Sequence, residues 1–143
     1  MPASRRKSRS SSGGVRLAAL DDAGVSPGQV DYVNAHAPGT VEGDNTEAPA
    51  ICRVLGEEVP VSSTKPVHGH QLGAVGATEA LICIQAVREG LIPPTVNLER
   101  PEEGLGINVV RGQPLRKPVG IAVSNSFGFG GHNAVLVVGP PPD

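Results

Sequence analysis

The chain has 143 residues, enough for one domain with a single core, and a formal net charge of −2. Residues 1–14 contain four basic residues and no acidic ones, so the rest of the chain contains 8 basic and 14 acidic residues. A body this acidic excludes nucleic acid as the main partner. No apolar run reaches the roughly 18 residues of a membrane span, and no signal peptide follows the basic start, so we expect a cytoplasmic protein.

Residues 1–14 are Ser/Arg-rich and are predicted to be a disordered basic tail, with a targeting or nucleic-acid arm as the less favoured alternative. The folded part is expected over residues 15–139, followed by a Pro-rich tail at 140–143. It would begin with the end of an amphipathic helix over Val15–Gly24, closed by Gly24.

The stretch from residue 30 to 55 predicts a strand, a loop and a helix. The strand over 30–35 ends at His36, and a histidine at the carboxyl end of a strand lies where α/β folds place active-site groups. Asp44 and Glu47 have the spacing of a helix start, and the helix should end at Leu55. Pro49 predicts that this helix either begins later or has a distorted first turn.

The following stretch, VSSTKPVHGHQLGAVGATEA (61–80), concentrates charged and imidazole side chains between a strand at 59–61 and a helix at 71–88. Lys65 and His70 would then lie near a helix N-terminus, which suits anions and developing oxyanions. Residues 72–87 are apolar nearly all round and predict a buried helix. Glu79 is the exception on this helix, and a buried carboxylate needs a partner, for which Lys65 is the candidate.

The last third of the chain contains a proline-rich connection, LIPPTVNLERPEEGLG, and three short strand signals at residues 107–110, 119–124 and 134–138. The glycine-rich loop NSFGFGGHN separates the last two, and its backbone can approach a ligand closely. Taken together, the pattern predicts an α/β fold in which a mixed sheet of about five short strands packs against helices.

The four histidines allow three interpretations. A zinc site from these residues is one, but no cysteine, HExxH or acidic ligand has metal-site spacing, and we expect no metal. Scattered structural histidines are the second. The third makes His36 and His70 a pair of donors or bases, with Lys65 and Glu79 setting their protonation, in a site that would stabilise an enolate. The histidines concerned are His36, His68, His70 and His132.

Three motifs, VNAHAPGTVEGD, SSTKPVHGHQLGAVGATEA and NSFGFGGHN, occur in order and at suitable spacing. They resemble the C-terminal half of the elongating β-ketoacyl-acyl-carrier-protein synthases, the ketosynthases of fatty-acid and polyketide biosynthesis. The resemblance runs from about Val15 to Val138 and implies a partial thiolase-like fold. It also implies acyltransferase chemistry: a cysteine is acylated, two histidines assist decarboxylation of malonyl-carrier protein, and the resulting enolate attacks the acyl thioester.

The resemblance also implies roles for individual residues. His36 and His70 match the two catalytic histidines, Lys65 matches the catalytic lysine and Glu79 its supporting glutamate. The remaining matches are Phe129 with Gly128 at the oxyanion hole and acyl-pocket gate, and Thr40 at the pantetheine arm. His68 falls on a variable loop position. No cofactor is implied beyond substrates carried on the phosphopantetheine of acyl carrier protein.

The first motif departs from the family pattern His-Gly-Thr-Gly/Ser-Thr. Ala37 replaces the glycine, and Pro38 replaces a threonine and removes both an N–H and a hydroxyl. We expect Pro38 to restrict Ala37 to extended geometry. These replacements leave open whether the carrier arm binds in the family's manner.

The family's nucleophilic cysteine lies in an N-terminal half that this sequence does not contain, so we expect a truncated or separately encoded half without full activity of its own. Cys52 and Cys83 sit among apolar helix-forming residues and are expected to be core residues. The expected partners are acyl carrier protein and either a second copy or a cysteine-bearing ketosynthase half. The alternatives are a non-catalytic remnant or interaction subunit and, third, a stand-alone enzyme using Cys52 or Cys83.

Overall fold

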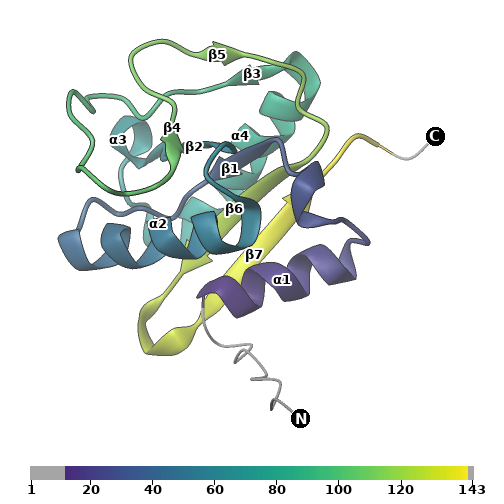
Figure 1. Cartoon of the computed structure of the whole chain (residues 1–143), viewed down its shortest axis with the longest axis horizontal. Helices are drawn as coiled ribbons and strands as arrows, with labels where there is room; N and C mark the ends of the chain where they lie inside the picture. The colour runs from purple at the N-terminus through teal and green to yellow at the C-terminus, as the bar shows by residue number, and fades with distance from the viewer. Residues whose placement is uncertain (1–11, 142–143) are drawn as a thin grey trace.

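The fold has three layers, in which one sheet is covered by helices on both faces. A computed structural model of the chain describes residues 12–141. Helices α1 (Ser12–Asp22) and α2 (Val41–Leu55) pack on one face, and α4 (Val75–Glu89) packs on the other (Figure 1). Three 3₁₀ turns, at Pro27–Gln29, Leu72–Ala74 and Phe129–Gly131, connect these elements.

The main sheet has five strands in the order β4-β2-β1-β6-β7. Four of them run parallel, and β7 pairs with β6 in the antiparallel direction, so the sheet is mixed as predicted. Strand β1 lies at its centre, with Val33 opposite Val61 of β2 and Val123 of β6. The strand bounds are β1 Tyr32–Asn34, β2 Pro60–Ser62, β4 Asn108–Val109, β6 Ala122–Phe127 and β7 Asn133–Val138.

The hydrophobic core has two parts, one on each face of the sheet, because successive side chains of a strand point to opposite faces. Tyr32 and Ala122 pack with Cys83 and Ala86 of α4. The next residues along the same strands, Val33 and Val123, point to the opposite face and join the core under α1 and α2. Successive side chains of a strand point to opposite faces, so a central strand buried on both sides needs apolar residues throughout.

A second, two-stranded sheet pairs β3 (Leu91–Ile92) with β5 (Leu115–Arg116). The sequence interpretation took residues 91–106 as an irregular proline-rich connection and missed β3. Gly90 makes this strand possible, because it ends α4 in the left-handed conformation (φ 59°) and its carbonyl accepts from the Lys117 N–H.

Helix α1 begins at Ser12, so the predicted tail is wrong for residues 12–14, while its prediction for residues 1–11 lies outside the described residues. The side chains buried on this helix also differ from the expected apolar face. Arg16 and Leu20 are buried, four residues apart on one side, while Val15 and Leu17 are only partly buried.

Helix α2 begins earlier than predicted. Thr40, and not Asp44, is its N-cap, because the Thr40 hydroxyl accepts from the Gly43 N–H at 3.2 Å. Pro49 therefore lies in the helix interior and leaves one carbonyl of the previous turn without its usual partner. Both expected ways of accommodating Pro49, a later start and a distorted first turn, assumed that it lay near the start of the helix.

Helix α4 is apolar, as predicted, and the described chain covers it along one face. Val75, Glu79, Cys83 and Ala86 are buried there. On the other side the side chain of Leu81 is 64% exposed and that of Ile84 is 40% exposed. Between β2 and α4 the chain forms a further short helix, α3 (Lys65–His68), which the sequence analysis did not predict.

Shortening a buried side chain of the core should lower the free energy of unfolding. Ile51 is fully buried beneath α2, and Ile51→Ala should lower the free energy of unfolding by about 2–4 kcal/mol through lost apolar contact and the cavity left behind. Leu81→Ala removes a similar volume from an exposed position and should change it by less than about 0.5 kcal/mol. Urea denaturation followed by circular dichroism measures both. Equal losses would contradict this description of the core.

Candidate active site

The polar side chains of the candidate site gather where three neighbouring parallel strands end. His36 follows β1, the segment from Lys65 to His70 follows β2, and Phe127 ends β6. Because parallel strands present their carboxyl ends at one edge of a sheet, residues far apart in sequence meet here. The site predicted from single motifs is therefore one place in the fold.

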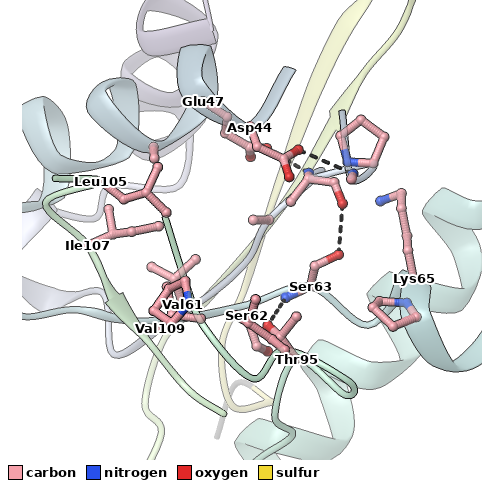
Figure 2. Close-up of a pocket in the computed structure, with 18 of the residues that line it drawn as sticks. Asp44, Glu47, Val61, Ser62, Ser63, Lys65, Thr95, Leu105, Ile107 and Val109 are labelled. Carbon is pink, nitrogen blue, oxygen red and sulfur yellow. Dashed lines mark hydrogen bonds between the residues drawn. The ribbon is translucent and has the colours of Figure 1, made fainter. Parts of the chain in front are cut away.

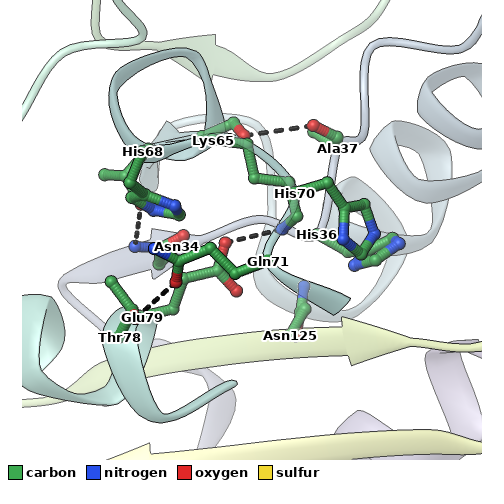
Figure 3. A network of polar contacts seen from close by, with 12 residues as sticks. Asn34, His36, Ala37, Lys65, His68, His70, Gln71, Thr78, Glu79 and Asn125 are labelled. Atoms are coloured by element: carbon green, nitrogen blue, oxygen red, sulfur yellow. Dashed lines mark hydrogen bonds and ion pairs between the residues drawn. The ribbon is translucent and has the colours of Figure 1, made fainter. Parts of the chain in front are cut away.

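His36 and His70 meet edge to face. Their ring centroids are 5.5 Å apart with an interplanar angle of 82°, and the ring of Phe127 lies 5.9 Å from that of His36. His36 is partly buried, whereas His70 is exposed. Figure 3 shows the two imidazoles side by side, with Lys65 and Glu79 beside them. The interpretation that paired these two histidines agrees with this geometry.

The two imidazoles differ in what holds them. The Leu72 N–H donates to Nδ1 of His70 at 3.2 Å, so the neutral His70 ring carries its proton on Nε2, which is a donor. Burial lowers the pKa of His36 to about 4, and the nearby charges of Lys65 and His70 add to this effect. His36 is therefore an uncharged imidazole at neutral pH.

Lys65 and Glu79 form the buried ion pair that the sequence predicted. Nζ of Lys65 lies 2.5 Å from Oε1 of Glu79, and the two side chains are 5% and 0% exposed. Burial raises the pKa of Glu79, and the hydrogen bond from Lys65 limits that rise. The pair places a cation close enough to His36 to add to the effect of burial, which is the main cause of the lowered pKa of that imidazole.

Glu47 fixes the backbone at His36. Its Oε1 accepts from the His36 N–H at 2.9 Å and from Nδ2 of Asn125 at 2.8 Å, and its Oε2 accepts from the Ala37 N–H at 2.7 Å. The carboxylate is 4% exposed. The sequence interpretation assigned Glu47 to a helix start, so its role in the site was missed. A glutamate in the apolar run around Ala48 and Ile51 was the signal that could have revealed a buried acid.

Ala37 adopts a backbone conformation that favours glycine. Its φ is +21°, so the predicted extended geometry is wrong. Both of its backbone polar groups are held, since its N–H donates to Glu47 and its carbonyl accepts from Oγ of Ser63 at 3.1 Å. The alanine thus takes the conformation available to the family's glycine, at a cost that these contacts offset.

The other predicted site residues lie at the start of α2, in α3 and at the 3₁₀ turn before β7. Thr40 is exposed and its hydroxyl caps α2. Phe129 is 97% exposed, and Gly128 adjoins it in a tight turn where a Cβ would lie 3.0 Å from the His132 carbonyl oxygen. His68 binds the Gly69 carbonyl and the Thr64 hydroxyl through its ring nitrogens, so it belongs to the loop and not to the pair.

A cavity of about 490 Å³ opens beside His70 and Lys65. In Figure 2 Lys65 lies on one side and Leu105 and Ile107 on the other, with Asp44 from α2 above. A cavity of this volume is in the range of small-molecule sites. Its apolar floor comes from α2, β2, β4 and the segment before β4, with side chains from Ala48, Ile51, Val61, Leu105, Ile107 and Val109.

Neither cysteine has the setting of a nucleophile. Cys83 is buried under the sheet, and burial raises the pKa of its thiol to about 12. Cys52 lies on α2 with its thiol directed to Glu57. Among residues 12–141 no three His, Cys, Asp or Glu side chains are arranged to hold a metal ion. No helix within the same range has the length and apolar character needed to cross a membrane.

The sequence of residues 3–99 matches the family model described as β-ketoacyl synthase, C-terminal domain. The chain belongs to this family. A 3-oxoacyl-[acyl-carrier-protein] synthase 2 of Coxiella burnetii is 45% identical over 122 residues, which are 83% of this chain and 30% of that protein. The resemblance inferred from the three motifs is confirmed. The chain spans about 30% of the length of the curated relatives it matches.

Solved ketosynthase structures have the same fold. The ishigamide ketosynthase/chain length factor superposes with a TM-score of 0.85 at 38% identity, over 90% of this chain and 32% of that one. The ketosynthase in the AntDE:AntF complex with a type II polyketide synthase acyl-carrier protein gives 0.86 at 30% identity, over 92% and 33%. The thiolase-like ketosynthase fold expected from the motifs is thus confirmed.

The depressed pKa of His36 predicts a pH dependence. Its imidazole should stay neutral on acidification until about pH 4, whereas an unfolded histidine binds its proton near pH 6.5. Between these values the unfolded state holds more protons, so this group should lower the free energy of unfolding as the pH falls from 6.5 towards 4.

Histidine ring ¹⁵N NMR measures this midpoint. His70→Ala removes one of the charges that disfavour protonated His36 and should raise the midpoint modestly, which also assigns the resonance. A midpoint near 6.5 in the unmodified chain would contradict the partial burial of His36 beside Lys65 and His70.

Proposed function

We propose that this chain carries the decarboxylation part of a β-ketoacyl-acyl-carrier-protein synthase active site. The supporting observation is the His36–His70 pair, 5.5 Å between ring centroids, beside the buried Lys65–Glu79 ion pair. The neutral state of His36 and the Nε2 proton of His70 suit hydrogen-bond donation to a developing oxyanion.

The proposed reaction begins with a malonyl thioester whose carbonyl oxygen accepts hydrogen bonds from His36 and His70. Breaking the bond to the carboxylate carbon releases CO₂ and leaves the electron pair as an enolate. The enolate carbon then attacks the carbonyl of an acyl group held as a thioester on a cysteine, and the cysteine thiolate leaves. Donors positioned for the oxyanion are worth about 3–4 kcal/mol each in such sites.

The remaining residues have supporting roles in this proposal. Burial lowers the pKa of His36 and Lys65, held by Glu79, adds to this effect, so that the ring serves as a neutral donor. Phe129 and Gly128 would form the oxyanion and acyl-pocket gate, and Thr40 would contact the pantetheine arm. The exposed positions of Phe129 and Thr40 leave both free to meet a substrate from outside.

We further propose that the nucleophilic cysteine comes from the other two thirds of a synthase, on the same or another polypeptide. The exposed apolar face of α4, with Leu81 and Ile84, supports this, because a helix that is apolar on both sides is usually covered on both. Acyl carrier protein would deliver the substrates, and the assembly would work in the cytoplasm. The AntDE:AntF complex contains a carrier protein bound to its ketosynthase.

A specific observation favours a second candidate, a non-catalytic interaction subunit. Ala37 and Pro38 change the turn after His36, and Ala37 occupies a glycine-type conformation. If this turn no longer admits a carrier arm, the chain would pair with a complete ketosynthase without performing decarboxylation.

Reconstitution separates the two candidates. With a cysteine-bearing segment that completes the synthase, the chain should release ¹⁴CO₂ from malonyl-carrier protein. His70→Ala should reduce that release by about 10²-fold or more, because a positioned acid/base or donor group contributes this much. His68→Ala, a change in the same loop outside the pair, should retain most of it. A stable complex without CO₂ release would favour the interaction subunit.

The pairing face can be tested independently of catalysis. Leu81→Asp places a charge on the exposed apolar side of α4 and should weaken binding of the completing segment by about tenfold or more. Val41→Asp, at a position on α2 that is 75% exposed, is the matched control and should bind normally. Surface plasmon resonance measures both. Normal binding by the Leu81 variant would show that this face is not used.

A further inference from the structure

Arg16 is a charged side chain buried where no charged group of residues 12–141 forms an ion pair with it. It lies on α1 and is 0% exposed. Its Nη1 donates to the Ala50 carbonyl at 2.9 Å, while Nε and Nη2 have no acceptor among the residues that the structure describes. An arginine remains protonated in proteins, so its charge must be balanced from nearby or destabilise the fold.

The nearest feature that can balance this charge is Glu47. Ala50, which accepts from Arg16, lies three residues after Glu47 on α2, so the two occupy adjacent turns of the same helix face. Burial lowers the pKa of Arg16, and the Glu47 charge acts in the opposite direction. The guanidinium and the carboxylate thus interact through the low-dielectric interior without a direct hydrogen bond.

Glu47 is a buried carboxylate that no positively charged donor contacts among the described residues. Its hydrogen-bond donors are two backbone N–H groups, of His36 and Ala37, and the amide of Asn125, all uncharged. The buried lysine of the site is bound to a different carboxylate, Glu79. Among the described residues, Arg16 is therefore a buried cation near α2 that can balance Glu47.

We propose that Arg16 is a positioning residue, whose charge balances the buried Glu47 carboxylate and thereby holds the His36–Ala37 turn in the geometry that brings His36 to His70. Its importance for catalysis rests on the proposed function, but the positioning itself does not. The turn needs such support, because Ala37 has a φ of +21° and is held by Glu47 on its N–H side.

A purely structural role for Arg16, filling space between α1 and α2, gives different expectations. Arg16→Met has similar length and no charge, so a space-filling role would be preserved, and apolar replacement of a buried charge is often tolerated. Under the proposal, the same substitution loosens the bonds to Glu47 specifically. Arg16→Lys retains the charge and should restore them.

Amide hydrogen exchange, measured by NMR on the full chain, reports how firmly the His36 and Ala37 N–H groups are bound to Glu47. In Arg16→Met the N–H groups of His36 and Ala37 should exchange about tenfold faster than in the unmodified chain. The Ala35 N–H, which donates to the Ser62 carbonyl at 2.9 Å, is the internal control and should keep its rate. The Arg16→Lys variant should return both rates to within about threefold of the original.

The same samples give a second readout at the His36 ring. The charged and titratable groups around it are Lys65, His70, Glu47 and Glu79. Loss of Arg16 leaves the Glu47 charge uncompensated, so protonation of His36 becomes easier and its pKa rises from about 4 towards its ordinary value. A space-filling residue would not move this midpoint.

Unchanged exchange at His36 and Ala37 with an unchanged His36 midpoint would overturn the proposal, as would equal acceleration at Ala35. If Arg16→Met does not fold, Arg16→Lys decides, because it retains the charge and differs from arginine in shape. Exchange at His36 and Ala37 within about threefold of the original then supports the proposal, and faster exchange at both overturns it. None of these outcomes depends on decarboxylation activity.

Discussion

The carboxylate of Glu47 joins the three elements on which the site depends. It is carried by α2, binds the backbone that follows β1, and binds Asn125 of β6. A buried carboxylate with three donors is stable only in one arrangement of those elements, because a lost donor would leave a desolvated negative charge. The crossover from β1 through α2 is thereby fixed at the point where the His36 ring is presented.

The site contains two buried carboxylates that are stabilised in different ways. Glu79 is neutralised at contact distance by Lys65, whereas Glu47 accepts from uncharged donors and is balanced at a distance. As a result, the two carboxylates affect His36 in different ways. The Lys65 side disfavours protonated His36, and the Glu47 side binds only the backbone of that residue. A neutral imidazole with a fixed backbone is the combined result.

The sequence was informative wherever a motif combined residue type with position. The histidine pair, the Lys65–Glu79 pairing and the mixed character of the main sheet could be predicted, whereas the order of its strands was not. The conformation of Ala37 could not, because the restriction imposed by the following proline predicts extended backbone and only tertiary contacts to Glu47 and Ser63 reverse it.

Arg16 shows a different limit of sequence reasoning. In an amphipathic pattern an arginine usually marks the solvent side of a helix, and the sequence analysis did not single out Arg16. Burial of this side chain depends on a carboxylate that lies on another helix and on a carbonyl of that helix. Such long-range compensation leaves no local periodic signal, and the same holds for the burial of Glu47.

The two histidines follow neighbouring strands, so the pairing of these strands determines which parts of the chain meet at the site. Adjacent strands lie about 4.7–4.9 Å apart, and the ring centroids of His36 and His70 are 5.5 Å apart. Pairing of β1 with β2 thus brings the two segments together whatever the length of the crossover, and the turn after α3 sets the final position of the His70 ring. Insertions in the connection between α2 and β2 would leave the spacing intact, so this part of the chain can vary in evolution or be lengthened by design while the two rings stay in register.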